Sequence, residues 1–182
     1  KQTRAFVYNF NTDAYSAKNY SLIHHDILTG ATQLAFLNNY SNNNTNYVFA
    51  LNGDGSIGCL GINVEFSVVG WNKWTTNGNF KGLTVIDDSL YALTQRFDND
   101  GSTLQTGLFL EKLTDQEIYL DAFHTTEADA SSFQGAQGLE GQTVQVIADG
   151  LVHPDVTVDN AGNFTLTRTS SSTQIGNQYT AS

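Results

Sequence analysis

Short stretches of alternating, β-branched or aromatic residues recur along the chain and predict strands. They cover residues 4–10, 47–51, 56–62, 80–86, 89–97 and 104–113. Segments rich in Asn, Asp and Gly, including Asp87-Asp88, separate them at the positions where hairpins need residues that tolerate positive φ. Three other segments, 20–29, 38–46 and 115–119, could hold helix or irregular structure, but none has a long 3.6-residue period. The pattern therefore predicts an all-β chain of antiparallel meanders.

The hydrophobic pattern weakens at residues 125–137, which are small and polar, and it resumes at residue 138. Strands are predicted after this point at 142–149, 152–158 and 163–168, with Asp149-Gly150 and residues 159–162 as the turns. We therefore expect three parts: a meander region over 1–124, a linker over 125–137, and a small separate antiparallel β domain over 138–182.

A weak internal repeat favours one architecture for the first part. The segment YVFAL at 47–51 and its NGDG turn are echoed about 42 residues later by SLYALT at 89–94 and a DNDG turn. This spacing is that of a four-stranded propeller blade, and the intervening WNKW segment falls where an outer strand of a blade is expected. Blade-like meanders are the leading interpretation, and a β-sandwich is the alternative.

Composition removes several classes of function. The chain contains no Met and begins at Lys1, which favours a fragment of a longer protein, and no apolar run is long enough to predict membrane insertion. The net charge of −10 disfavours direct binding to nucleic acid, because contacts to its phosphate backbone call for a basic patch. With a single cysteine, Cys59, the chain cannot form an internal disulfide. Cys59 is predicted to be a buried residue of a strand.

Few residues of the sequence are candidates for metal binding or catalysis. His24, His25 and Asp26 are the residue types that ligate metals, but neighbouring side chains of a strand point to opposite faces. The segment DNDG at 98–101 resembles the start of a calcium loop but has no further acidic residue before Glu111, so a hairpin turn is favoured. No nucleophile elbow, P-loop or dinucleotide fingerprint is present. We therefore predict no cofactor, no metal site and no enzymatic activity.

Trp71 and Trp74 are the other candidate contact residues. Aromatic rings of this kind stack on sugars, but two residues three apart in a strand face opposite sides, so packing in a core or an interface is the favoured role. These two residues, together with His24 and His25, are our candidates for an interface or a glycan contact.

Taken together, two segments resemble the tail nozzle, or tail tubular protein B, family of short-tailed bacteriophages, which includes phage stabilisation proteins. The first is YVFALNGDGSIGCLGINVEFSVVGWNKWTTNGNFKGLTVIDDSLYALTQRF, with a DG turn, a GW-x-x-W strand and a strand ending in Arg; SLIHHDIL precedes it. The second, LEGQTVQVIADGLVHPDVTV followed by NFTLTRTSSSTQIGNQYTAS, is similar to the C-terminal module of the family. Similar small modules occur as insertions in ubiquitin-activating enzymes.

The resemblance implies a structural component of the phage tail, in the virion, assembled in the cytoplasm of the host bacterium. The expected partners are copies of the chain itself, in a homo-oligomeric ring, and other tail proteins. The genome would pass through the channel without specific binding, and the negative charge suggests an acidic lumen from which DNA is repelled. The alternative is a carbohydrate-binding or adhesin module of a phage tail, and a hydrolase acting on the bacterial envelope is a third class.

Overall fold

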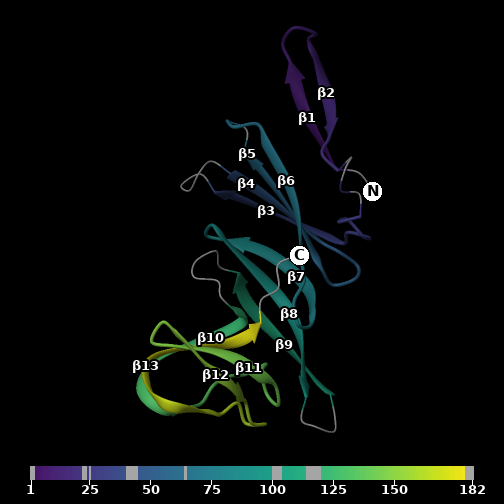
Figure 1. Ribbon diagram of the computed structural model, residues 1–182. Helices are drawn as coiled ribbons and strands as arrows, with labels where there is room; N and C mark the ends of the chain where they lie inside the picture. The colour runs from purple at the N-terminus through teal and green to yellow at the C-terminus, as the bar shows by residue number, and fades with distance from the viewer. Residues whose placement is uncertain are drawn as a thin grey trace. The chain divides into compact units, whose positions relative to one another are not determined.

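The computed structural model describes residues 3–21, 24, 26–39, 45–63, 65–99, 104–113 and 120–178. Every regular element in these ranges is a β-strand, and the strands form several antiparallel sheets (Figure 1). The predicted all-β class is confirmed. No helix in the described part of the chain is long and apolar enough to cross a membrane.

The strands form four sheets, each built from consecutive segments of the chain. The first is a hairpin of two strands, and the second and third are simple meanders with the strand orders β3-β4-β5-β6 and β7-β8-β9. The fourth has the order β10-β13-β11-β12. The strand bounds are β1 Arg4–Asn9, β2 Ala14–Asn19, β3 Gln33–Asn39, β4 Thr45–Leu51, β5 Ile57–Asn63, β6 Val68–Trp74, β7 Asn79–Ile86, β8 Ser89–Asn99, β9 Leu104–Leu113, β10 Leu120–Phe133, β11 Thr143–Ala148, β12 Leu151–Thr157 and β13 Phe164–Gln178.

The chain divides into two compact units. The first comprises residues 1–75 and 80–92, and the second comprises residues 76–79 and 93–182. Strand β8 therefore starts in the first unit and ends in the second. The predicted three-part division at residues 124 and 138 does not coincide with these units.

The two copies of the sequence repeat occupy comparable places. YVFAL lies in β4 and SLYALT lies in β8, and each is an inner strand of its meander. The WNKW segment lies in β6, which is the outer strand of the four-stranded sheet. This sheet therefore has the strand order of a propeller blade.

The β3–β6 sheet supplies the core of the first unit. Phe49 faces Cys59 across β4 and β5, and Leu51 faces Ile57 in the same pair, and all four side chains are buried. Because side chains alternate along a strand, Leu60 lies on the opposite face, where it is also buried. Both faces of the inner strands are therefore apolar, which explains why the sequence reads as nearly continuous hydrophobic runs.

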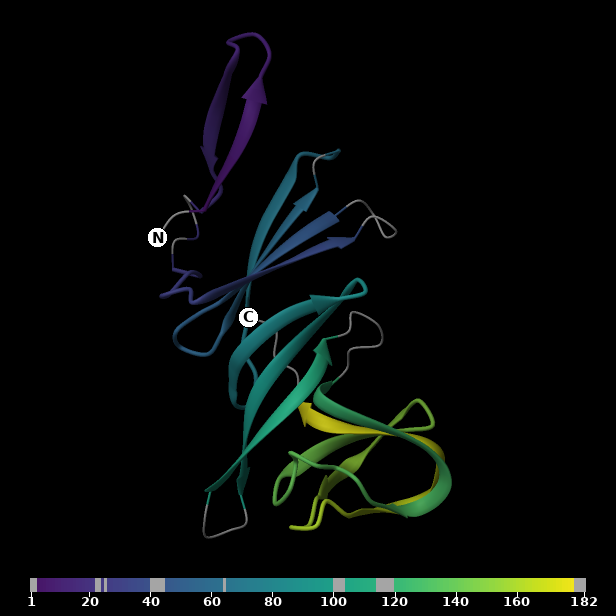
Figure 2. The same cartoon turned by 180° about the vertical axis from the view of Figure 1, so that it is seen from behind.

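The fourth sheet encloses the core of the second unit. Figure 2 shows its two longest strands, β10 in green and β13 in yellow, bending together along their length. Their pairing contains three register shifts, and such bulges increase the bend of a strand. The buried core side chains come from β10, β11, β13 and the loops between the strands; they are Phe133, Ala136, Leu139, Val144, Val146, Ala148, Val158, Phe164, Leu166 and Ile175.

The linker predicted at residues 125–137 is mostly a strand. Residues 125–133 belong to β10 and pair with β13, so the small β module has a fourth strand that the pattern did not reveal. The bulges break the alternation of polar and apolar positions, and most side chains of this stretch are exposed or half-buried. The backbone ladder to β13, rather than apolar side chains, therefore holds the strand in place.

Two predicted hairpin turns are confirmed in detail. Asp87 and Asp88 have φ of 46° and 56°, and Asp149 and Gly150 have φ of 51° and 74°. Two successive positive φ angles are typical of the type I′ turn, which matches the twist of the strands on either side. Strand β11 is thereby joined directly to β12, as the sequence pattern predicts.

Candidate functional site

The β1–β2 hairpin carries a cluster of exposed aromatic side chains. Tyr8 pairs with Tyr15 across the strands, and Phe6 lies two residues before Tyr8, on the same face. The ring of Tyr8 packs edge-on against Tyr15 and Phe10, with centroids 5.2 and 4.9 Å away. Phe6, Phe10 and Tyr15 are 73%, 88% and 72% exposed. We call these four residues, Phe6, Tyr8, Phe10 and Tyr15, the aromatic face.

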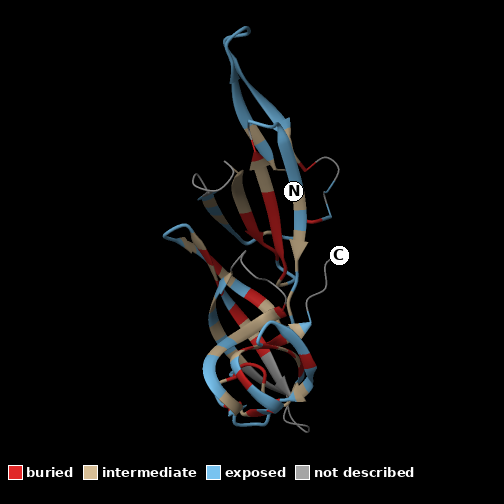
Figure 3. Cartoon of the chain, turned by 60° about the vertical axis from the view of Figure 1, so that its left-hand side comes forward, coloured by how far each residue is buried: buried red, intermediate tan, exposed pale blue. Residues whose placement is uncertain are grey.

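Solvent surrounds the hairpin on both sides. Figure 3 shows it in the exposed colour along almost its whole length, and the buried core lies elsewhere in the chain. Hydrogen bonds between Tyr20 and Thr3 and between Thr3 and Ser21 close its base. The indole Nε1 of Trp71 in β6 donates to the carbonyl oxygen of Tyr20 at 2.7 Å and so ties the base of the hairpin to the second sheet.

Trp71 and Trp74 do not form a shared platform. Trp71 is opposite Leu60 and Trp74 is opposite Ile57 in the register of β5 and β6, so the two rings lie on different faces of the sheet. Trp74 packs against Phe49, with ring centroids 5.4 Å apart. Trp71 therefore contacts Tyr20, and Trp74 contacts Phe49. Both half-buried indoles pack within the first unit.

The histidines are dispersed. His24 is exposed in an irregular segment, and His25 lies outside the described residues. His153 is buried: its Nε2 accepts a hydrogen bond from the backbone N–H of Thr167, so its Nδ1 carries the proton and donates to the carbonyl of Pro154. No group of three potential metal ligands occurs among the described residues. Part of the DNDG segment, from Asp100 on, lies outside them.

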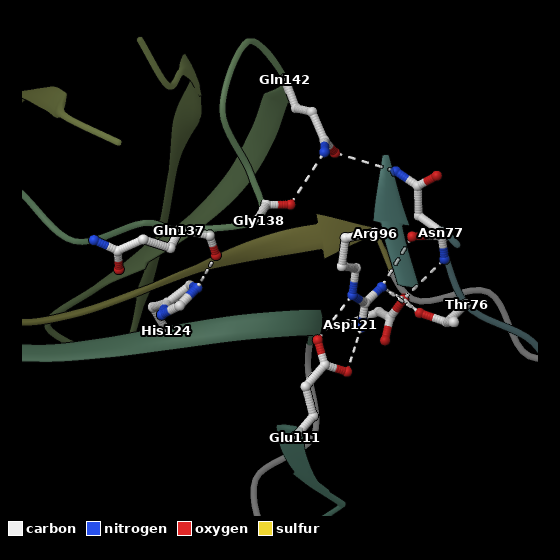
Figure 4. Close-up of polar contacts among 9 residues, drawn as sticks. All are labelled: Thr76, Asn77, Arg96, Glu111, Asp121, His124, Gln137, Gly138 and Gln142. Carbon is white, nitrogen blue, oxygen red and sulfur yellow. Dashed lines mark hydrogen bonds and ion pairs between the residues drawn. The ribbon is translucent and has the colours of Figure 1, made fainter. Parts of the chain in front are cut away.

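Arg96, near the end of β8, is the centre of a polar cluster (Figure 4). Arg96 in β8 donates from Nε and Nη2 to the two carboxylate oxygens of Glu111 in β9, at 2.8 and 2.7 Å. Its Nη1 donates to Thr76 and to the carbonyl of Asn77, and lies 3.7 Å from Asp121 in β10. Only 3% of the Arg96 side chain is exposed. We call this group the Arg96 cluster.

The Arg96 cluster joins segments that are distant in sequence. Asp121 Oδ2 accepts a hydrogen bond from Thr76 Oγ1 at 2.6 Å. The side-chain amide of Asn77 donates from Nδ2 to Gln142 Oε1 at 3.1 Å. The turn before β7, the strands β8, β9 and β10, and the loop before β11 are therefore held by one network. Because the guanidinium is committed to a bidentate pair and cannot lose its proton, the cluster is suited to positioning strands and not to proton transfer.

The sequence contained a signal for the Arg96 cluster. Leu90, Ala92, Thr94 and Arg96 alternate along β8 and are all buried, so period-two counting places Arg96 on the buried face. A buried arginine needs carboxylates. Which carboxylates these are depends on how β9 and β10 fold back, and the pattern did not show this.

Several carboxylates order turns. Asp149 Oδ1 accepts hydrogen bonds from the backbone N–H groups of Ser172 and Ser171, which lower the pKa of Asp149 to about 2. Hydrogen bonds from Ser56 likewise hold the pKa of Asp54 below its ordinary value. Burial raises the pKa of Cys59 to about 12, so the thiol stays protonated and unreactive at neutral pH.

A shallow depression lies over β12 and the start of β13. Its lining includes Asp155, Asp159 and Phe164, and the buried His153 forms part of its floor. Both nitrogens of His153 already have partners, and the carboxylate of Asp159 accepts from Ala161 and Asn163. Of the groups that line this depression, His153 and Asp159 are thus occupied by hydrogen bonds within the chain.

No family model matches this chain, and no curated protein matches its sequence. The resemblance to phage tail nozzle proteins stays a prediction from the residues quoted above.

Proposed function

We propose that this chain is a structural building block that acts by assembling with other protein subunits. The observation that carries this proposal is the aromatic face of the β1–β2 hairpin, in which three large rings are more than two-thirds exposed. Contiguous exposed apolar surface of this kind is unusual in monomers and marks sites of protein association. The polar clusters that are described serve to position strands and turns, which is consistent with a structural role.

The finer proposal rests on the sequence resemblance. We propose that the assembly is the tail tube or nozzle of a short-tailed phage, in which copies of the chain form a ring around the path of the genome. The blade-like β3–β6 meander and the separate β10–β13 sheet support this proposal, because the resemblance implies a propeller-like part and a small β domain. The net charge of −10 supports a lumen wall that repels DNA.

The test is the size and shape of the purified chain. Light scattering after size exclusion, from about 1 to 200 µM, is expected to show a concentration-dependent oligomer, since weak interfaces associate in the micromolar range. Negative-stain images of the largest species are expected to show rings. A chain that remains monomeric throughout this range would contradict the assembly function.

The second candidate is glycan binding. Half-buried tryptophans and an open depression next to exposed carboxylates are features of carbohydrate sites, but the two indoles lie on different faces of the sheet. A glycan array with the full chain separates the candidates. Reproducible binding that is lost in Trp71→Ala or Trp74→Ala, together with a monomeric state, would favour the adhesin role.

A further inference from the structure

We infer that the aromatic face of the hairpin docks on the second unit of another copy of this chain, over Val152 at the start of β12. This inference rests on the proposed assembly function and names its two surfaces. Four observations carry it: the apolar area of the hairpin, the lack of cover on it, the distribution of charge, and the exposed Val152 of β12.

The aromatic face is large enough to be the main part of an interface. A phenylalanine or tyrosine side chain buries about 150–250 Å², so the exposed fractions of these four rings amount to about 400–700 Å². A specific interface of standard size takes about 800 Å² from each partner. The hairpin therefore supplies most of one side of such an interface, and its aromatic residues are of the type that carries binding energy.

The hairpin also lacks support of its own. A two-stranded hairpin is at most marginally stable in water without a sheet or a core to pack on. In β1 and β2 every residue except Ala5 and Asn19 is exposed, and both strands leave an outer edge unpaired in the described structure. Docking on a partner would cover its apolar face and stabilise its fold.

Charge selects the second unit of another copy as the partner. Residues 1–21 contain three basic side chains and one acidic one, although the whole chain has a net charge of −10. The second unit contains three basic and twelve acidic residues, whereas the first contains five basic and six acidic. A basic aromatic hairpin and an acidic unit attract one another, and this complementarity favours association between copies.

The start of β12 has the features that complement the hairpin. Val152 is 89% exposed, whereas Leu151, which is 64% exposed, points to the opposite face of the sheet because side chains alternate along a strand. The exposed residues Asp149 and Asp155 lie on either side of them in the chain. Arg4 in β1 lies on the same face as Phe6 and Tyr8, while Lys18, which pairs with Ala5, lies on the opposite face of the hairpin. Pro154 removes a backbone donor from this edge strand, so the contact is made by side-chain faces and not by adding a strand to the sheet.

A contact between two different surfaces is head-to-tail. Repetition of such a contact gives a closed ring where the rotation closes and a filament where it does not. Docking of the hairpin on the second unit of the next copy would therefore arrange the copies head-to-tail, as the proposed ring requires.

The experiment uses two variants of the full chain, each with one surface destroyed. Phe6→Asp places a charge in the aromatic face, and Val152→Asp places one in the acceptor surface. Sedimentation velocity is run on the wild type, on each variant, and on their equimolar mixture. Leu108→Asp, at an exposed apolar position of β9, is the control.

Each variant alone is expected to weaken self-association at least about tenfold, since a charge replaces a buried anchor. The mixture is expected to form a dimer that does not grow further, because each copy retains only one working surface. Association of the wild type is expected to weaken between about 50 and 500 mM salt, since its charge attraction is screened. The control is expected to associate like the wild type.

Two outcomes would overturn the inference but leave assembly in place. One is a Val152→Asp variant that associates as the wild type does, which means that the hairpin docks elsewhere. The other is a mixture that stays monomeric although both variants fold, as circular dichroism would show. A wild type that never associates would contradict the assembly function as well.

Discussion

Removal of Arg96 would leave the carboxylates of Glu111 and Asp121 without their cation. Arg96 neutralises Glu111 and lies near Asp121, and its own side chain is almost completely buried. We expect Arg96→Leu to lower the free energy of unfolding by about 3 kcal/mol, because breaking a buried pair leaves charges without partners. The carboxylates of Glu111 and Asp121 are 27% and 29% exposed, so water can reach them and the loss should not be larger. Urea unfolding measures this change in the free energy of unfolding.

The matched control is Arg168→Leu. Arg168 also pairs with an aspartate, Asp149, but both side chains are well exposed and the nitrogen–oxygen distance is 3.4 Å. Exposed pairs contribute at most about 1 kcal/mol. An Arg96 variant no less stable than the Arg168 variant would show that the Arg96 cluster does not hold the second unit together.

Asp149 leads to a prediction about pH. Its folded-state pKa of about 2 lies below the ordinary value of 3.8, so its carboxylate stabilises the fold above about pH 4, and this contribution is lost as the pH falls toward 2. We expect Asp149→Asn to lower Tm at pH 7 and the difference from wild type to shrink near pH 2. Asp155→Asn is the control, because its exposed carboxylate makes no described hydrogen bond. A constant difference in Tm across this range would exclude the ionised carboxylate as the cause.

At the scale of elements, the β10–β13 pair depends on a glycine. A Cβ on Gly176 would lie 2.7 Å from the carbonyl oxygen of Asp121 and 3.0 Å from Phe123 Cα, where β10 bulges over β13. We expect Gly176→Ala to lower the free energy of unfolding by about 1–3 kcal/mol, since the backbone of β10 must shift. Gly70→Ala in β6 is the control, because a Cβ there meets nothing within 4 Å. Equal stability of the two variants would mean that β10 does not approach β13 so closely.

At the scale of the whole molecule, charge governs contact with the genome. Nonspecific binding to DNA has dissociation constants of about 10⁻⁴ to 10⁻⁶ M at physiological salt and depends on basic side chains that neutralise phosphates. With 18 acidic and 8 basic residues, the chain is expected to show no binding to duplex DNA in fluorescence anisotropy up to about 100 µM. A basic protein of similar size is the positive control. Binding by this chain would contradict the proposed repelling lumen.

Much of the strand pattern was predictable because alternation is a local property. Strands β4, β5, β7, β8 and β9 and the I′ turns at residues 87–88 and 149–150 follow from side-chain type within a few residues. Strand β2 was missed because AYSAKN contains few of the residues that favour strands. Strand β10 was missed because its pairing, not its side chains, keeps it extended.

The candidate site was less accessible to sequence reasoning. The aromatic residues of 4–10 were visible, but a strand pattern alone does not tell whether an apolar face packs on a core or meets solvent. The predicted opposite placement of Trp71 and Trp74 is confirmed by the register of β5 and β6. Whether these residues take part in an interface or bind a glycan stays a prediction.

The sequence by itself determined the all-β class, the hairpin turns, the placement of the two tryptophans and the net charge, because each depends on residues adjacent in the chain or on composition. Only the tertiary structure decided that Glu111 and Asp121 meet Arg96, that β10 completes the C-terminal sheet, and that the aromatic face of the hairpin is left uncovered. These features depend on which distant segments come together, and strand pairing over long separations is set by the packing of the whole unit and not by any local pattern.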